Sequence, residues 1–208
     1  KLSNLKEKYW KEVFDNLDEI TTRLTSYSRN ELFNKFQNIN QVDFTEVNIL
    51  NVIIWVVKNA NSYYNSQLIE LFKDLSDREN VKPYKSNLKL FEDDGWRWNA
   101  KEKTHYTLDY RLIVSKYGWI NTYSWESDLN EGRIISEISD IATVARNLGF
   151  DSSNNYEIPE TIGKKYYVYM KNGDVLFEYK VYKNGNAHFK FNIEFSKALN
   201  VEASRLLG

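Results

Sequence analysis

The stretch KKYYVYMKNGDVLFEYKVYKNGNAHFKFN, residues 164–192, predicts two β-hairpins that share their central strand. Asn-Gly is the strongest short hairpin signal, because both residues of a two-residue turn need a positive φ. The first turn is therefore predicted as a two-residue loop at Asn172-Gly173, with Lys171 paired to Asp174. This pairing puts apolar side chains of both strands on one face, namely Tyr166, Val168, Met170, Val175, Phe177 and Tyr179.

The second Asn-Gly pair, Asn184-Gly185, needs a longer loop. A two-residue loop would pair Val181 with His188 and mix polar and apolar residues on each face, because side chains alternate along a strand. A three-residue loop at 183–185, with Gly185 in the left-handed region, restores the alternation. The predicted partners are then Val181 with Ala187, Tyr179 with Phe189, Phe177 with Phe191, and Glu178 with Lys190.

The resulting three-stranded meander has one apolar face, which must pack on another element because an isolated hairpin sheet is marginal in water. Asn192 is placed to cap a following helix that buries Phe195, Leu199 and Leu206. The opposite, polar face of the meander carries Tyr167, Tyr169, Lys180, Tyr182, Asn186, His188 and Lys190.

Composition narrows the class of protein. The chain has 208 residues, of which 42% are hydrophobic and 15% aromatic, enough for a large core. Its net charge of −1 means that any contact with nucleic acid must come from a local patch. The absence of cysteine excludes disulfides, thiolate catalysis and cysteine-based metal sites. Because the start, KLSNLKEKYWKE, is unlike a signal peptide and no apolar run approaches a membrane span, we expect a cytoplasmic protein with no membrane association.

The first third of the chain has a helical pattern. Apolar residues at three- and four-residue steps predict helices over 3–25, 30–37, 44–58 and 64–75, with a break at 59–62. Asp43 is placed to cap the third helix. That helix has almost no polar side, so we expect it at the centre of the core.

The remainder of the chain mixes strands and helices. The pattern predicts a strand over 107–115 and a helix over 134–148 that ends at Gly149. Helices followed by mixed elements predict an α+β fold, with N-terminal helices packed against a C-terminal antiparallel meander. We expect a single domain, 1–208, with a possible sub-division into a helical layer, 1–79, and a mixed layer, 80–208.

Basic and aromatic residues interleave at NVKPYKSN, residues 80–87, and at WRWN, residues 96–99. Lysine and arginine neutralise phosphates, and aromatic rings and guanidinium planes stack on bases. The pattern indicates a nucleic-acid contact, but it equally fits a loop held to the core by its tryptophans, and the acidic residues at 92–94 dilute its charge. The candidate binding residues here are Tyr84, Lys85, Trp96, Arg97 and Trp98.

The segment HYTLDYR, residues 105–111, carries a second constellation. On a strand, His105, Asp109 and Arg111 would share a face. They could act as a general base, its orienting carboxylate and a phosphate clamp, or form a structural ion pair. If His188 joined His105 and Asp109, the three could ligate a metal, but the spacing does not place them together. We therefore predict no metal and no cofactor.

The polar face of the meander is the third candidate. Between residues 164 and 192, six lysines stand against Asp174 and Glu178, so the local charge is +4. A sheet face of aromatic residues and lysines can bind a single strand, although a tyrosine-rich face can also be covered by a helix. The candidate binding residues are Lys180, Tyr182, Asn186, His188 and Lys190. The sequence has no glycine-rich phosphate loop, nucleophile elbow or HExxH helix.

The order of five short motifs resembles a domain family of unknown function that occurs in phage and mobile-element proteins. Members of that family are found in bacterial genomes, sometimes joined to an adenine-type DNA methyltransferase, whose own signatures are absent here. The resemblance covers residues 59–208 and implies a nucleic-acid or anti-defence setting, without supplying a catalytic residue. The motifs are NVKPYKSN, WRWN, HYTLDYR, DIATVARNLGF and KNGNAHFKFN…ALNVEASRLLG.

We therefore expect a non-enzymatic accessory protein that binds DNA or RNA, of phage or mobile-element origin and active in conflict with host defence. One alternative is a phosphate-directed enzyme such as a nuclease, which would use His105, Asp109, Arg111 and His188. Another alternative is an inhibitor that binds a host defence protein through its tyrosine-rich face.

Overall fold

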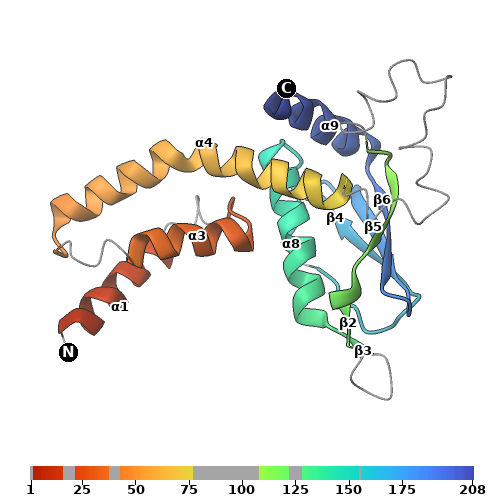
Figure 1. Ribbon diagram of the computed structural model, residues 1–208, viewed down its shortest axis with the longest axis horizontal. Coiled ribbons are helices and arrows are strands. Elements are labelled where there is room, and N and C mark those ends of the chain that lie inside the picture. The colour runs from red at the N-terminus through yellow and green to blue at the C-terminus, as the bar shows by residue number, and fades with distance from the viewer. Residues whose placement is uncertain (1, 16–21, 38–42, 77–107, 122–127, 155) are drawn as a thin grey trace. The chain divides into compact units, whose positions relative to one another are not determined.

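The computed structural model of the chain is shown in Figure 1. The residues that it describes are 2–15, 22–37, 43–76, 108–121, 128–154 and 156–208. The chain divides into two compact units, Lys1–Gln67 and Leu68–Gly208.

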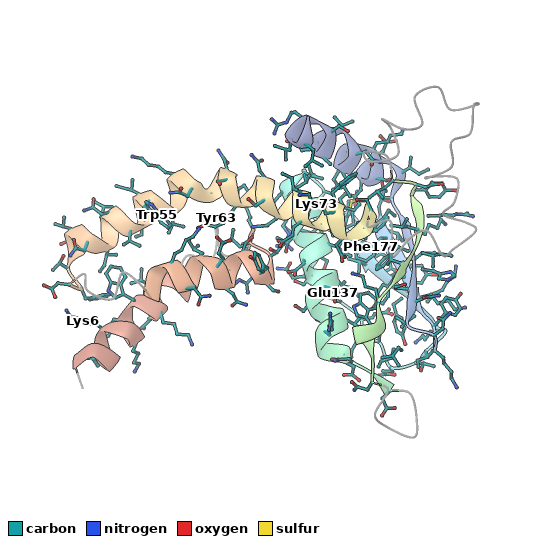
Figure 2. All side chains as sticks on the ribbon, viewed as in Figure 1. Lys6, Trp55, Tyr63, Lys73, Glu137 and Phe177 are labelled. Carbon is teal, nitrogen blue, oxygen red and sulfur yellow. The ribbon has the colours of Figure 1, made fainter. Side chains whose placement is uncertain are left out.

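The first unit contains helices α1 (Leu2–Asp15) and α3 (Ser26–Gln37) and the first part of α4 (Glu46–Ser76). Lys35 on α3 forms an ion pair with Glu31 at 2.8 Å, and its Nζ lies 5.3 Å from the ring centroid of Tyr63 on α4. Figure 2 labels Tyr63. The small core of this unit consists of Trp10, Leu24, Leu32, Val52, Val56 and Tyr63.

Two of the predicted helix boundaries in this unit are wrong. The described part of α1 ends at Asp15, and residues 22–24 form a turn, so the first helix does not continue to residue 25. Thr45, not Asp43, caps α4, because its Oγ1 accepts a hydrogen bond from the Asn48 N–H at 3.3 Å.

The predicted break at 59–62 does not occur, and α4 is continuous. The Asn59 side chain donates to the carbonyl of Trp55 at 2.7 Å, and the Ser66 hydroxyl donates to the carbonyl of Ser62 at 2.9 Å. Polar side chains that bond back to carbonyls of their own helix leave its backbone ladder intact.

The apolar run of α4 is not the centre of the core, contrary to expectation. Val52 and Val56 are buried, but Val47 and Leu50 are 68% and 57% exposed, and Ile54 and Val57 are 42% and 54% exposed. The exposed four lie on one stripe at three- and four-residue steps, opposite the side that packs in the unit's core. This part of α4 therefore packs one side in the core of the unit and exposes an apolar stripe on the other side.

The second unit is built on a four-stranded antiparallel sheet in the order β1-β6-β5-β4. The strands are β1 (Arg111–Ser115), β4 (Lys165–Tyr169), β5 (Val175–Val181) and β6 (Asn186–Phe191). Helix α8 (Glu131–Asn147) lies along one face of this sheet, and α9 (Ile193–Leu207) follows β6 directly (Figure 1). Smaller elements are the 3-10 helix η1 (Tyr117–Trp119) and a two-stranded ribbon of β2 (Ile120–Asn121) and β3 (Asp128–Leu129). The described elements confirm the expected α+β class.

One face of the sheet forms the core of this unit with α8, α9 and the last turns of α4. Phe177 lies on this face and is fully buried (Figure 2). The sheet contributes Leu112, Val114, Tyr166, Val168, Leu176, Phe177, Tyr179, Val181, Ala187, Phe189 and Phe191. The helices contribute Leu68, Phe72, Leu75, Ile134, Ile138, Ile141, Phe195, Leu199 and Ala203.

The predicted register of the second hairpin is confirmed. Val181 pairs with Ala187, Tyr179 with Phe189, Phe177 with Phe191, and Glu178 with Lys190. The loop has three residues, because the Tyr182 N–H donates to the Asn186 carbonyl, and Gly185 has φ +79°.

The first hairpin differs from its prediction. Its loop also has three residues, Lys171 to Gly173, because the Met170 N–H donates to the Asp174 carbonyl at 2.8 Å. A β-bulge at Leu176 then corrects the alternation, so Tyr169 pairs with Val175 and Val168 with Phe177. As a result Leu176 is buried and Val175, expected on the apolar face, is 39% exposed.

The predicted helix ends in this unit are close to the observed ones. Asn192 caps α9 through hydrogen bonds from the N–H groups of Glu194 and Phe195, at 2.9 and 3.3 Å. The helix predicted at 134–148 is α8, and Gly149 follows its end with φ +94°. The strand predicted at 107–115 begins only at Arg111.

Lys116, just after β1, joins two helices through a charge network. Its Nζ lies 2.6 Å from a carboxylate oxygen of Asp74 on α4 and 2.9 Å from one of Glu137 on α8. Figure 2 labels Glu137. Burial disfavours the charged form of Lys116, but the two carboxylates outweigh it and raise the pKa of Lys116. Burial likewise opposes ionisation of Glu137, but Lys116 and Arg133 lower the pKa of Glu137. The network therefore holds α4, α8 and the sheet together as ionised groups.

None of the helices in the described ranges combines the length and the apolar character that a membrane crossing requires.

The register can be tested with neighbouring residues of β6. Phe189→Ala removes a ring that is 3% exposed and lies 5.9 Å from Trp119, so the free energy of unfolding should fall by about 3–5 kcal/mol. His188→Ala changes the opposite face and should cost far less. Chemical denaturation would measure both values, and equal losses would show that the register is wrong.

The Lys116 network predicts a pH dependence of stability. Glu137→Gln should lower the free energy of unfolding at neutral pH by about 1–3 kcal/mol, because Lys116 then keeps one carboxylate partner. Since the folded-state pKa of Glu137 lies below its ordinary 4.5, its contribution is present above pH 4.5 and is lost as pH falls through the lowered pKa. The difference between variant and wild type should therefore shrink in acid.

Denaturant titrations from neutral pH to below pH 4.5 would measure this difference. Glu194→Gln is the matched control, because Glu194 pairs with Lys197 on the surface and should contribute little at any pH. A deficit of Glu137→Gln that stays constant in acid would contradict the ionised network.

Candidate functional site

Eight side chains of the four strands lie on the face of the sheet opposite α8, and we call this surface the open face. The strand register arranges them in two rows across the sheet. One row is Ile113, His188, Lys180 and Lys165, and the other is Arg111, Lys190, Glu178 and Tyr167. All eight retain exposure to solvent.

A groove with a volume of about 610 Å³ lies over this face. It begins near Tyr182, at the end of β5, and reaches Asp109, which precedes β1. Its polar lining consists of Asp109, Arg111, Lys165, Glu178, Lys180, Tyr182, His188 and Lys190.

The position of β1 in this groove is fixed from the core. The Leu108 N–H donates to the Asn200 side chain at 2.7 Å, and the Asn200 amide donates to the Leu108 carbonyl at 2.9 Å. These two bonds hold the residue before Asp109 against α9. They therefore set where Asp109 and Arg111 enter the groove.

The groove is positively charged. Four cations, from Arg111, Lys165, Lys180 and Lys190, stand against the carboxylates of Asp109 and Glu178. Lys165 and Glu178 form an ion pair at 3.1 Å, which raises the pKa of Lys165. Because the Lys165 side chain is 56% exposed, this pair adds little to stability and can be rearranged by a ligand.

His188 and Tyr182 form an aromatic pair at one end of the groove. Their ring centroids lie 4.3 Å apart, and Lys180 Nζ lies 4.9 Å from the Tyr182 ring. Burial, together with the neighbouring charge of Lys180, lowers the pKa of His188 below 6.5. His188 is therefore neutral at pH 7 and offers a flat ring and a hydrogen-bonding nitrogen rather than a positive charge.

The structure brings together six of the predicted site residues, namely Asp109, Arg111, Lys180, Tyr182, His188 and Lys190. Asn186, predicted beside them, is only 5% exposed. It sits where β6 leaves the turn, and its N–H donates to the Asn184 side chain at 3.2 Å, so the turn encloses it. Tyr84, Lys85, Trp96, Arg97, Trp98 and His105 lie outside the described residues.

Sequence reasoning missed Lys165 as a site residue, and it did not pair β1 with β6. The signal for Lys165 was present, because it alternates with Tyr167 and Tyr169 on the polar side of the first strand. The pairing of Arg111 with Lys190 joins residues far apart in the chain, and no local pattern marks it.

A second depression of about 400 Å³, the apolar hollow, adjoins the groove where β6 turns into α9. It shares Glu178 and Lys190 with the groove. Its other lining residues are Tyr110, Tyr167, Val175, Phe191, Asn192, Ile193 and Glu194.

The chemistry that these residues support is the binding of an anion with flat groups. Guanidinium and ammonium groups bind phosphate, and aromatic rings stack on bases. Across the residues that the structure describes, no group of three or more His, Asp or Glu side chains is placed to hold a metal ion.

Comparison with known proteins yields one match. No curated protein and no solved structure matches the chain. The resemblance to a family of unknown function is confirmed, and it extends further towards the N-terminus than the motifs between residues 59 and 208. The chain belongs to the family described as Domain of unknown function (DUF4942), which matches residues 2–207.

Proposed function

We propose that the chain is a non-enzymatic accessory protein that binds single-stranded nucleic acid through its open face. The observation that carries the proposal is the groove itself, where four cations and the Tyr182–His188 ring pair converge from four strands. The whole chain has a net charge of −1, so the concentration of cations on this face is local.

The spacing of the cations suits a phosphate backbone. Lys190 pairs with Arg111 across one strand boundary, and Lys180 pairs with Lys165 across another. The two rows are separated by two residues along each strand, or about 7 Å. A chain of phosphates that crosses the sheet obliquely, from β4 and β5 to β6 and β1, would thus meet two cations at each row.

The aromatic pair favours a single strand over a duplex. Bases in a duplex stack on each other, so their faces are unavailable to protein rings. Tyr182 and His188 are half-buried in the groove, where an unpaired base could stack on them. Four strands that present aromatic rings and cations on one face provide a platform of the kind that single strands use.

The biological setting is also a proposal. The motif resemblance supports an origin in phage or mobile elements and a role in conflict with host defence. A DNA or RNA partner fits such a setting, because defence systems act on the nucleic acid of the invader.

A second candidate function is a phosphate-directed enzyme such as a nuclease. The observation in its favour is that Asp109, Arg111 and His188 line the same groove, with His188 neutral and so able to accept a proton. If this candidate is right, His188→Ala abolishes turnover without unfolding the protein. The wild type would have to cleave single- or double-stranded substrates with one of several divalent metals, and a protein without cleavage in all of these assays is not a nuclease.

The leading function predicts a change in salt dependence. Lys180→Ala combined with Lys190→Ala should weaken binding to single-stranded DNA and RNA. It should also lower the slope of log affinity against log salt by about 1.4, because each phosphate-contacting lysine contributes about 0.7. Fluorescence anisotropy at several salt concentrations would measure the affinity and the slope.

The matched control is Lys171→Ala combined with Lys197→Ala. Both lysines form surface ion pairs, with Asp151 and Glu194, and both lie outside the groove. This control removes the same net charge and should keep nearly the wild-type slope. Absence of binding by the wild type, or equal slopes for the two double variants, would refute the assignment of the open face.

A further inference from the structure

The apolar hollow continues the groove of the open face without interruption. Glu178 and Lys190 line both depressions, and they are direct partners across β5 and β6. A single strand of nucleic acid that passes His188 and Lys190 on β6 therefore reaches the hollow with its next nucleotide. One ligand can occupy both depressions at once.

The two depressions differ in chemical character. The hollow is lined by Tyr110, Tyr167, Val175 and Ile193, where the groove has cations. Two acidic residues, Glu178 and Glu194, also line it beside Lys190, and each forms an ion pair with a lysine outside the hollow, Lys165 and Lys197. A phosphate in the hollow would face these carboxylates, so the occupant of the hollow is an uncharged, flat, largely apolar group.

A nucleobase has this character, and the hollow has the size for it. A volume of about 400 Å³ is within the range of small-molecule sites and admits a base with its sugar. Tyrosine rings provide stacking surfaces, and Lys190 at the boundary can hold the phosphate that joins this nucleotide to the groove. The hollow thus complements the groove along one strand.

The carboxylates add a selectivity. An ionised carboxylate only accepts hydrogen bonds, and it pairs with exocyclic amino groups such as N4 of cytosine. Glu178 already accepts one bond, from Lys165 at 3.1 Å, and its remaining acceptor sites are available to a ligand. Thymine and uracil have no exocyclic amino group, and their one donor on that edge, N3–H, lies between two carbonyl oxygens that repel a carboxylate.

We propose that the apolar hollow is a subsite for an amino-bearing base, namely cytosine, adenine or guanine, in the single strand of nucleic acid whose phosphates lie on the open face. This inference rests on the proposed function, and it adds a preference for amino-bearing bases. It gives Glu178 a role in recognition beyond its ion pair with Lys165.

The test compares four labelled eight-residue probes of equal charge, namely oligo-dC, oligo-dA, oligo-dT and an abasic strand. Fluorescence anisotropy with the full chain should show oligo-dC and oligo-dA bound at least about five-fold more tightly than the abasic strand. The affinity of oligo-dT should lie between these values, because thymine can stack but offers the carboxylate only an N3–H flanked by two carbonyl oxygens.

Two variants separate stacking from amino recognition. Tyr167→Ala should weaken oligo-dC binding about five-fold and leave the abasic probe unchanged. Its matched control is Tyr169→Ala, the neighbouring ring on β4, which lines neither depression and should have no effect. Glu178→Met should bind the abasic probe more tightly, since it removes a negative charge, and should lose the preference for oligo-dC over oligo-dT. A purely structural role of Glu178 would not produce this combination.

The outcomes distinguish this inference from the proposed function. Equal affinity for all four probes, with the salt dependence intact, would overturn the base subsite and leave phosphate binding in place. Tighter binding of oligo-dT than of oligo-dC would overturn the role of Glu178. Absence of binding to every probe would overturn both the subsite and the proposed function.

Discussion

The parity of the β5–β6 register is the constraint on which the second unit depends. Side chains alternate between the two faces, so a slip of one residue would expose Phe177 and Phe189 and bury Lys180 and Lys190. Burying two unpaired ammonium groups in an apolar core is prohibitive, which leaves a single register. The three-residue loop that ends at Gly185, with its positive φ, sets that register. The core and the cationic face are thus two consequences of the same choice.

The same constraint explains the bulge in the first hairpin. Its loop repeats the Lys-Asn-Gly sequence of the second and takes the same length, three residues. That length alone would shift the alternation of β5 by one residue. The extra residue, Leu176, absorbs the shift and allows Phe177 and Tyr179 to stay on the buried face.

Much of the sheet could be predicted from sequence, because local signals carry it. The parity argument identified the partners of Glu178 and Tyr179, and Asn192 was recognisable as a helix cap. The pairing of β1 with β6 could not be predicted, because it depends on distant contacts such as the two Leu108–Asn200 hydrogen bonds. The length of the first Asn-Gly loop was predicted wrongly. A bulge in β5 restores the alternation that the longer loop would shift, and an Asn-Gly dipeptide carries no information about a bulge.

In the helices and in the site too, features set by local sequence could be predicted, and features set by distant contacts could not. Hydrophobicity alone placed the α4 run in the core, but burial depends on how many neighbours the fold provides, and Leu50 and Val47 have an open side. For the site, alternation was enough to gather Lys180, His188 and Lys190 on one face. Arg111 and Asp109 could be assigned to the same site only once β1 was known to pair with β6. The apolar hollow required the junction of β6 with α9, which no single motif describes.

The central claim is that the open face of the sheet, opposite the core, binds single-stranded nucleic acid. Its most direct test is a nuclear magnetic resonance titration of the full chain with an unlabelled oligo-dC strand, observed at the side chains. We expect the largest shifts at the His188 ring and the Lys180 and Lys190 ammonium groups, with the buried Phe177 and Phe195 rings nearly unchanged. Shifts confined to the exposed stripe of α4, or no shifts at saturating oligonucleotide, would contradict the claim.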